Sequence, residues 1–204
     1  MKPIRSRAQL EEFGRERLSP NFFMRDFLYS EIAATEGMSN APDDPDLALR
    51  AGRHLCLDLL EPIQEQFGRI AVRSAYRSSA VNARGNELGA SCARNEANYA
   101  SHIWDRHDAS GRMGATACIV VPRIADYCGG GGDWRALAWW IHDRLPYSTL
   151  YFFPKLTAFN IQWREEPERR IDSYVAPKGC LTRSGMDNHG GDHSAAYRNL
   201  LNEH

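Results

Sequence analysis

The sequence lacks a charge excess of either sign. Its 204 residues carry 25 lysines and arginines against 26 aspartates and glutamates, which gives a formal net charge of −1. Proteins that bind nucleic acid usually carry a basic patch or stripe, and disordered tails often carry blocks of like charge. We therefore expect a folded protein that has no nucleic-acid partner.

Long apolar runs are also missing. The longest candidates, residues 136–141 and 150–153, are far shorter than the roughly 20 residues that cross a bilayer. The first 17 residues are polar and charged, without the apolar segment of a secretory signal. We expect a cytoplasmic protein that has no membrane partner.

The cysteines show no pattern typical of a disulfide framework or a zinc finger. They are five in number, irregularly spaced and without a Cys-x-x-Cys pair. This usage favours reduced thiols in a cytoplasmic protein. A chain of this length buries enough surface to fold without a disulfide or a metal. The cysteines are Cys56, Cys92, Cys118, Cys128 and Cys180.

Hydrophobic spacing predicts helices early in the chain and strands later. The longest helix is expected at residues 46–66, where an apolar stripe recurs every three or four positions. Asp44 and Pro45 suit the start of that helix. The other helices are expected at 6–15, 24–36, 78–84 and 134–145. Strands are expected at 69–74, 115–121, 148–153, 158–163 and 169–175, and a loop at 177–193.

This order of elements predicts an α+β fold. We expect a small antiparallel sheet with helices packed on one side. Residues 1–17 would form an N-terminal helical arm, and residues 18–204 a single domain. The stretch at 85–100 is polar and contains glycine, which indicates irregular backbone.

Three segments, taken in chain order, carry a resemblance to a known family. Residues 18–30 read LSPNFFMRDFLYS, and residues 67–78 read FGRIAVRSAYRS and are followed by Asn82. The pair Ser101-His102 then precedes Gly114-Ala-Thr-Ala-Cys118. The series resembles the zinc D-alanyl-D-alanine carboxypeptidases, with about eight residues inserted after the histidine. The resemblance implies a Hedgehog/DD-peptidase-like fold.

The resemblance also implies a catalytic zinc, which usually has three protein ligands and one open position. His102 occupies the position of a ligand. The family's aspartate falls on Cys118, which is either a thiolate ligand or a small core residue. Arg164 stands near the expected place of the late histidine, and arginine cannot bind a cation. A replacement ligand would come from His189 or His193, unless their segment is only a polar loop.

Other residues are implied in substrate binding and catalysis. Arg77 matches an arginine that binds a substrate carboxylate or stabilises transition-state charge, a role that suits the forked guanidinium. Arg73 lies four residues earlier, and either arginine could instead form a structural salt bridge. Tyr76 and Asn82 would shape the pocket. Glu165 would supply the base, unless it belongs to a solvated strand end.

Two functions follow from this resemblance. The first is a zinc-dependent hydrolase of short D-amino-acid or peptidoglycan-type peptides, either a bacterial cytoplasmic dipeptidase or a phage-encoded cell-wall enzyme. The alternative is a catalytically inactive or repurposed binding protein on the same scaffold, which the missing aspartate and late histidine favour. Residues 104–108 offer a further set of histidine and aspartate side chains, or form a charged turn. The oligomeric state stays open.

Overall fold

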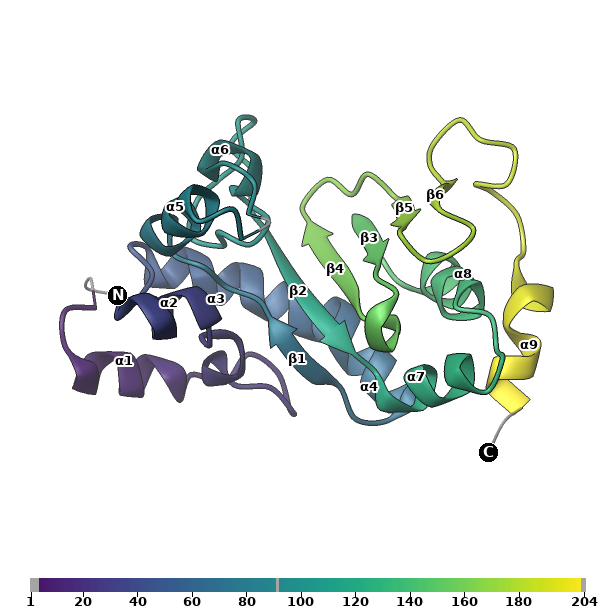
Figure 1. The fold of residues 1–204 in the computed structure, drawn as a ribbon, viewed down its shortest axis with the longest axis horizontal. Coiled ribbons are helices and arrows are strands. Elements are labelled where there is room, and N and C mark those ends of the chain that lie inside the picture. Colours follow the sequence, from purple (N-terminus) through teal and green to yellow (C-terminus); the bar gives the residue numbers. More distant parts are fainter. Residues whose placement is uncertain (1–3, 91, 203–204) are drawn as a thin grey trace.

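The sheet has six strands in the order β1-β2-β4-β3-β5-β6 (Figure 1). The computed structural model describes residues 4–90 and 92–202. The α+β class is confirmed, but the expectation of a small antiparallel sheet is wrong, because β3 and β5 are parallel. β5 follows β4 in sequence but pairs with β3, and these two strands run in the same direction. The strands are β1 (Ala71–Ser74), β2 (Gly114–Val120), β3 (Thr149–Phe152), β4 (Phe159–Arg164), β5 (Arg170–Ser173) and β6 (Gly179–Thr182).

One long helical segment, predicted at 46–66, supports the sheet. It begins as α3 (Pro45–His54), continues through a π-helical turn, Leu55–Leu60, and ends as α4 (Glu61–Phe67). The side chain of Asp44 accepts a hydrogen bond from the backbone N–H of Leu47 at 3.0 Å and so caps the start. The π-helical turn lies just before Pro62, whose backbone nitrogen cannot donate the usual helical hydrogen bond.

The remaining helices surround the sheet. The predicted helix at 24–36 is wrong, because this segment divides into a 3-10 turn, Met24–Phe27, and a separate α2 that Ser30 caps. The expected loop at 177–193 includes β6, and α7 and α9 were not expected. The α-helices are α1 (Arg7–Gly14), α2 (Glu31–Glu36), α3 (Pro45–His54), α4 (Glu61–Phe67), α5 (Ser79–Glu87), α6 (Asn95–Asn98), α7 (Pro122–Gly129), α8 (Arg135–Arg144) and α9 (Ser194–Asn202).

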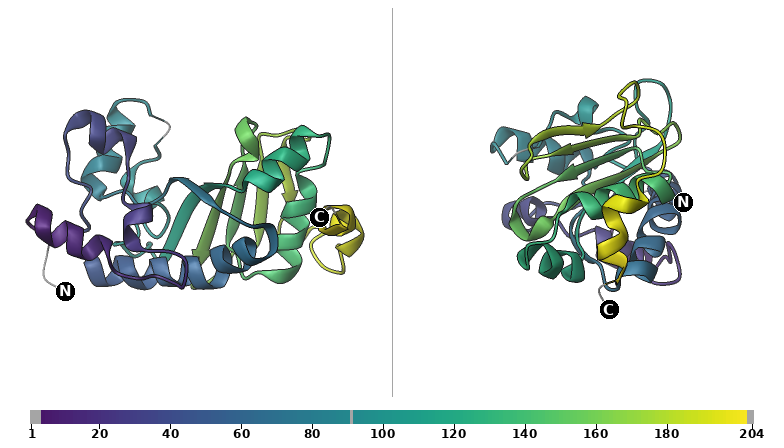
Figure 2. Two further views of the ribbon diagram at one scale, coloured as in Figure 1. Left: turned by 90° about the horizontal axis from the view of Figure 1, so that it is seen from below. Right: turned by 90° about the vertical axis from the view of Figure 1, so that its right-hand side faces the viewer.

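The two faces of the sheet differ in character. Side chains alternate along a strand, so Leu150 and Phe152 are buried in the core while Thr149 and Tyr151 project from the other face. The long helix runs along the core face, and α2, α5 and α6 stand beside the other face (Figure 2). This leaves the second face open over its central strands.

The N-terminal helix belongs to the same packed body. Phe13 of α1 is fully buried in the core cluster that also contains the long helix and the sheet. The expected arm at 1–17 therefore packs against the domain, and residues 1–3 of it lie outside the described residues. In the described part of the chain, no helix is both long enough and apolar enough to span a bilayer.

Candidate functional site

A cleft of about 490 Å³ lies over the open face of the sheet. Its floor comes from β2, β4 and β3, one wall from the segment that follows β1, and part of the rim from the start of α2. Five of the residues singled out in the sequence belong to its lining. They are Arg73, the buried Tyr76, Arg77, His102 and Cys118.

Strand register arranges the floor as a row of side chains. Ser74 of β1 pairs with Cys118 of β2, which pairs with Asn160 of β4. Asn160 in turn pairs with Tyr151 of β3, and Tyr151 with Asp172 of β5. Residues opposite one another project from the same face of a sheet. The row therefore crosses the strands from the arginine end of the cleft to an aromatic end.

Arg77 is the most unusual polar group in the cleft. Its Nη1 donates a hydrogen bond to the Sγ atom of Cys92 at 2.5 Å, while its buried Nε has no partner among the described residues. Within residues 4–90 and 92–202, no aspartate or glutamate forms an ion pair with it. Burial lowers the pKa of this guanidinium, although the Cys92 thiol opposes the shift. A half-buried cation without an acidic partner favours an anionic ligand.

His102 forms part of the wall next to Arg77. Its Nδ1 lies 2.8 Å from the carbonyl oxygen of Ala75, and its own carbonyl accepts a hydrogen bond from the Arg77 N–H. A carbonyl only accepts, so Nδ1 carries the proton and Nε2 keeps a lone pair. Burial, together with the charge of Arg77, lowers the pKa of His102 to about 4. The ring is therefore neutral at pH 7.

The lowered pKa of His102 predicts a loss of stability in mild acid. The histidine of the unfolded chain takes up a proton as the pH falls through about 6.5, whereas the folded ring resists until about pH 4. We expect this group to remove up to about 3 kcal/mol of unfolding free energy between pH 7 and pH 4. Urea unfolding of His102→Gln should show a flatter pH dependence. His107→Gln, which changes an exposed histidine, should keep the wild-type slope, and equal slopes for all three proteins would contradict this.

Cys118 is a neutral thiol in the cleft floor. Burial raises its pKa, and the nearby charge of Arg73 offsets this only in part. Arg73 is exposed and, among the described residues, makes no ion pair. The thiol itself therefore adds no negative charge to the cleft, while Arg73 adds a second positive charge.

Tyr76 and Asn82 support the cleft from behind. The Tyr76 ring is fully buried against Trp104, with 6.0 Å between ring centroids. The Asn82 amide donates hydrogen bonds to the Ala93 carbonyl and to the Asn95 side chain, both at 2.9 Å. These two residues hold the wall in place: the Asn82 amide is hydrogen-bonded within it, and the Tyr76 hydroxyl is buried without a hydrogen-bond partner among the described residues.

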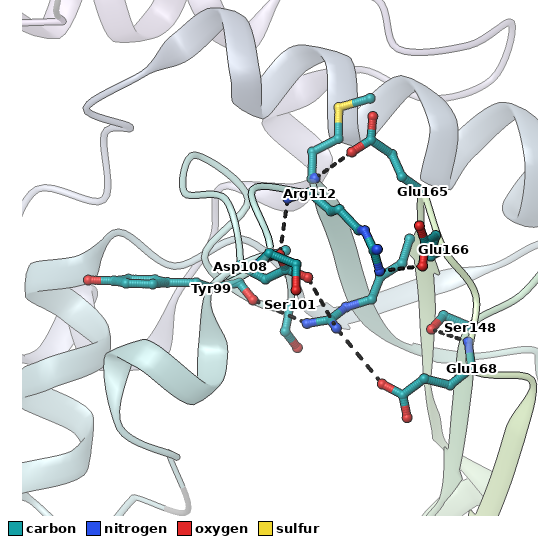
Figure 3. Close-up of polar contacts among 12 residues, drawn as sticks. Tyr99, Ser101, Asp108, Arg112, Ser148, Glu165, Glu166 and Glu168 are labelled. Carbon is teal, nitrogen blue, oxygen red and sulfur yellow. Dashed lines mark hydrogen bonds and ion pairs between the residues drawn. The ribbon is translucent and has the colours of Figure 1, made fainter.

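Glu165 lies at the end of β4, outside the lining of the cleft (Figure 3). Its Oε2 accepts a hydrogen bond from the Met113 N–H at 2.8 Å. Beside it, Arg112 pairs with Glu166, and Arg164 lies 3.6 Å from the carboxylate of Asp108. These contacts fasten the insert after His102 to the sheet and favour a structural role for Glu165, while its role as the base stays a prediction.

The structural role of Glu165 can be tested by removing its carboxylate. Glu165→Ala loses one exposed hydrogen bond, so we expect a cost of at most about 1 kcal/mol in unfolding free energy. Any ligand of the cleft should bind the variant with unchanged affinity in a calorimetric titration. A strong loss of activity in an otherwise folded variant would instead restore Glu165 as the expected base.

His189 and His193 lie in a different part of the molecule. His193 is stacked on Trp139 of α8, with centroids 4.1 Å apart, and its Nδ1 lies 2.6 Å from Asp143. The His189 carbonyl is 2.8 Å from Nε2 of His142. None of these groups lines the cleft of Arg77. They attach the segment between β6 and α9 to α8.

The donor set does not fit the implied zinc well. Over residues 4–90 and 92–202, no group of three or more His, Cys, Asp or Glu side chains is placed to hold a metal ion. The cleft supplies two of the expected ligands, His102 and Cys118, whereas catalytic zinc usually has three from the protein. Zinc binding stays a prediction.

Several lining residues were not found from the sequence. Thr149, Tyr151 and Phe153 come from β3 and its end, and Asn160 from β4. The alternation of the segment at 148–153 is the signal that could have placed Tyr151 and Thr149 opposite the buried Leu150. Neither family models, nor curated proteins, nor solved structures yield a match to this chain. Any proposed function must therefore rest on the chemistry of the cleft.

Proposed function

We propose that the cleft binds a small ligand through a carboxylate group and that Arg77 holds this group. One observation carries the proposal: the Arg77 guanidinium is half-buried, and within residues 4–90 and 92–202 it pairs only with a thiol. Desolvating a cation is costly unless a counter-charge is supplied. A carboxylate supplies that charge and can accept two parallel hydrogen bonds from a guanidinium.

The surroundings of Arg77 suit this ligand. Arg73 adds positive charge on the same wall, and neutral His102 adds no negative charge. Among the described residues, the side chain of Asn160 has no hydrogen-bond partner, so its amide can bind a polar group next to the carboxylate. The cleft floor holds Cys118 as a small neutral thiol.

The resemblance to the zinc D-alanyl-D-alanine carboxypeptidases supports the same role. In that family, the arginine that Arg77 matches binds a substrate carboxylate. We propose a divergent Hedgehog/DD-peptidase-like fold for this chain. The incomplete donor set favours the repurposed binding protein over the hydrolase. The proposed ligand is a short peptide or cell-wall peptide with a free carboxyl end.

A matched pair of ligands tests the proposal. We would titrate the protein with one short peptide as its free acid and as its C-terminal amide, and follow binding by calorimetry. Loss of a charged hydrogen bond costs about 1.5–3 kcal/mol, so the free acid should bind at least about tenfold more tightly than the amide. Equal affinities would contradict carboxylate recognition.

A zinc peptidase is the second candidate. It is favoured by the His102 ring, which is neutral and whose Nε2 has no partner among the described residues, as suits a metal ligand in the same cleft as Cys118. This candidate predicts about one zinc per chain in protein purified without added metal, because a catalytic site with three protein ligands holds a single zinc ion. His102→Ala should abolish the zinc. A metal-free wild type whose stability is unaffected by a chelator would rule out this candidate.

A further inference from the structure

Three aromatic side chains gather at the end of the cleft opposite the arginines. Tyr151, Phe153 and Tyr174 form this aromatic platform, with centroid separations of 4.8 to 6.1 Å. Tyr151 and Phe153 line the cleft, and Tyr174 is 53% exposed. Exposed aromatic clusters of this kind mark surfaces that contact a ligand or partner.

The platform offers apolar contact and no free charge. Contact with Tyr174 and burial raise the pKa of Tyr151 to about 12, so its hydroxyl stays neutral. The nearest carboxylate along the row, Asp172, already pairs with Arg170 through two hydrogen bonds of 2.6 and 2.9 Å. An aromatic ring of a ligand gains apolar contact and ring-to-ring packing here.

The row of floor residues gives the scale of a ligand that reaches from the arginine end of the cleft to the aromatic platform. From Ser74 beside Arg73 to Tyr151, the row crosses β1, β2, β4 and β3. Three strand spacings of roughly 4.8 Å give about 14 Å. An extended peptide advances roughly 3.4 Å per residue, so about four residues cover this distance.

Resting on the proposed function, we infer that the ligand is an extended peptide of about four residues with an aromatic residue at its far end. Its carboxylate meets Arg77, and the side chain of the fourth residue from that carboxylate packs on the aromatic platform. Between them, Ser74 and Asn160, whose side chains form no hydrogen bond within the described part of the chain, face the peptide backbone from the floor. The positive charge of Arg77 therefore selects the carboxyl end of the peptide, and the apolar area of the aromatic platform selects the side chain at the other end.

The position of the aromatic residue is the variable to test. The probes are acetyl-Phe-Gly-Gly-Ala, acetyl-Ala-Gly-Gly-Ala and acetyl-Gly-Gly-Phe-Ala, all as free acids and measured by calorimetry. Burying an aromatic side chain should tighten binding about tenfold or more, so the first peptide should bind best. Tyr174→Ala should remove that advantage. Leu57→Ala, which shortens an exposed apolar residue on the long helix, should retain it.

The outcomes separate this inference from the proposed function. If all three peptides bind equally and Arg77→Ala weakens each of them, carboxylate binding stands and the platform inference is overturned. The same conclusion follows if Tyr174→Ala keeps the preference for the first peptide. If no peptide binds, both are overturned. If the preference for the first peptide is lost with Tyr174→Ala, and Arg77→Ala weakens the binding of all three peptides, both are supported.

Discussion

Arg77→Ala should weaken the binding of a peptide carboxylate by about 10- to 100-fold while leaving the protein folded. A hydrogen bond between charged groups contributes about 1.5–3 kcal/mol, and every 1.4 kcal/mol changes affinity about tenfold. The substitution breaks no ion pair within the described residues, because the side chain pairs only with the Cys92 thiol. Calorimetric titration measures the affinity, and thermal unfolding checks the fold.

Two further variants show whether the effect belongs to the guanidinium at this site. Arg77→Lys keeps the charge but loses the forked donors, so it should bind with intermediate affinity. Arg84→Ala removes an arginine that pairs with Glu36 and Glu87 outside the cleft lining, and should bind like the wild type. Wild-type affinity in Arg77→Ala would show that Arg77 is structural.

Trp104→Ala should give the largest loss of stability, about 3–5 kcal/mol of unfolding free energy. The indole is fully buried, 5.4 Å from the Phe27 ring and 6.0 Å from the Tyr76 ring by centroid. Its Nε1 also donates a hydrogen bond to the Thr116 carbonyl at 3.2 Å. The substitution leaves a cavity where the N-terminal segment, the cleft wall and β2 meet. Urea unfolding measures the change.

Trp104→Phe separates packing from hydrogen bonding. It keeps much of the ring but loses the donor to Thr116, so we expect a smaller cost of about 1–3 kcal/mol. Trp104 lies two residues after His102, and a loosened wall should also weaken ligand binding in the alanine variant. If Trp104→Ala cost less than about 1 kcal/mol, the indole would not be the packing centre of this wall.

Periodic segments are the part of the fold that the sequence predicts well. The long helix repeats its apolar residues every three or four positions, and β2 is a continuous apolar run. The pattern cannot give strand order, because pairing depends on contacts between distant residues. The parallel placement of β5 beside β3 is of this kind. β6 is short and mostly exposed, so it has little hydrophobic signal.

The candidate site divides in the same way. Arg77 and His102 lie in segments that the resemblance aligned, and both line the cleft. His193 was grouped with them because two histidines lie four residues apart in a polar, glycine-containing segment, and that spacing does not say where a loop will pack. Its ring is held by Trp139 and Asp143 of α8. Tyr151 was missed because an aromatic residue in a strand is more often part of the core.

The most direct test of carboxylate binding observes the Arg77 side chain itself. Its Nε–H has no partner in the described structure and is therefore a local reporter of ligand contact. In an NMR titration with a short peptide acid, we expect the Arg77 Nε–H signal to shift progressively and to saturate with the calorimetric dissociation constant. The C-terminal amide should leave it unchanged. A peptide acid that binds without moving this signal would contradict the proposed role of Arg77.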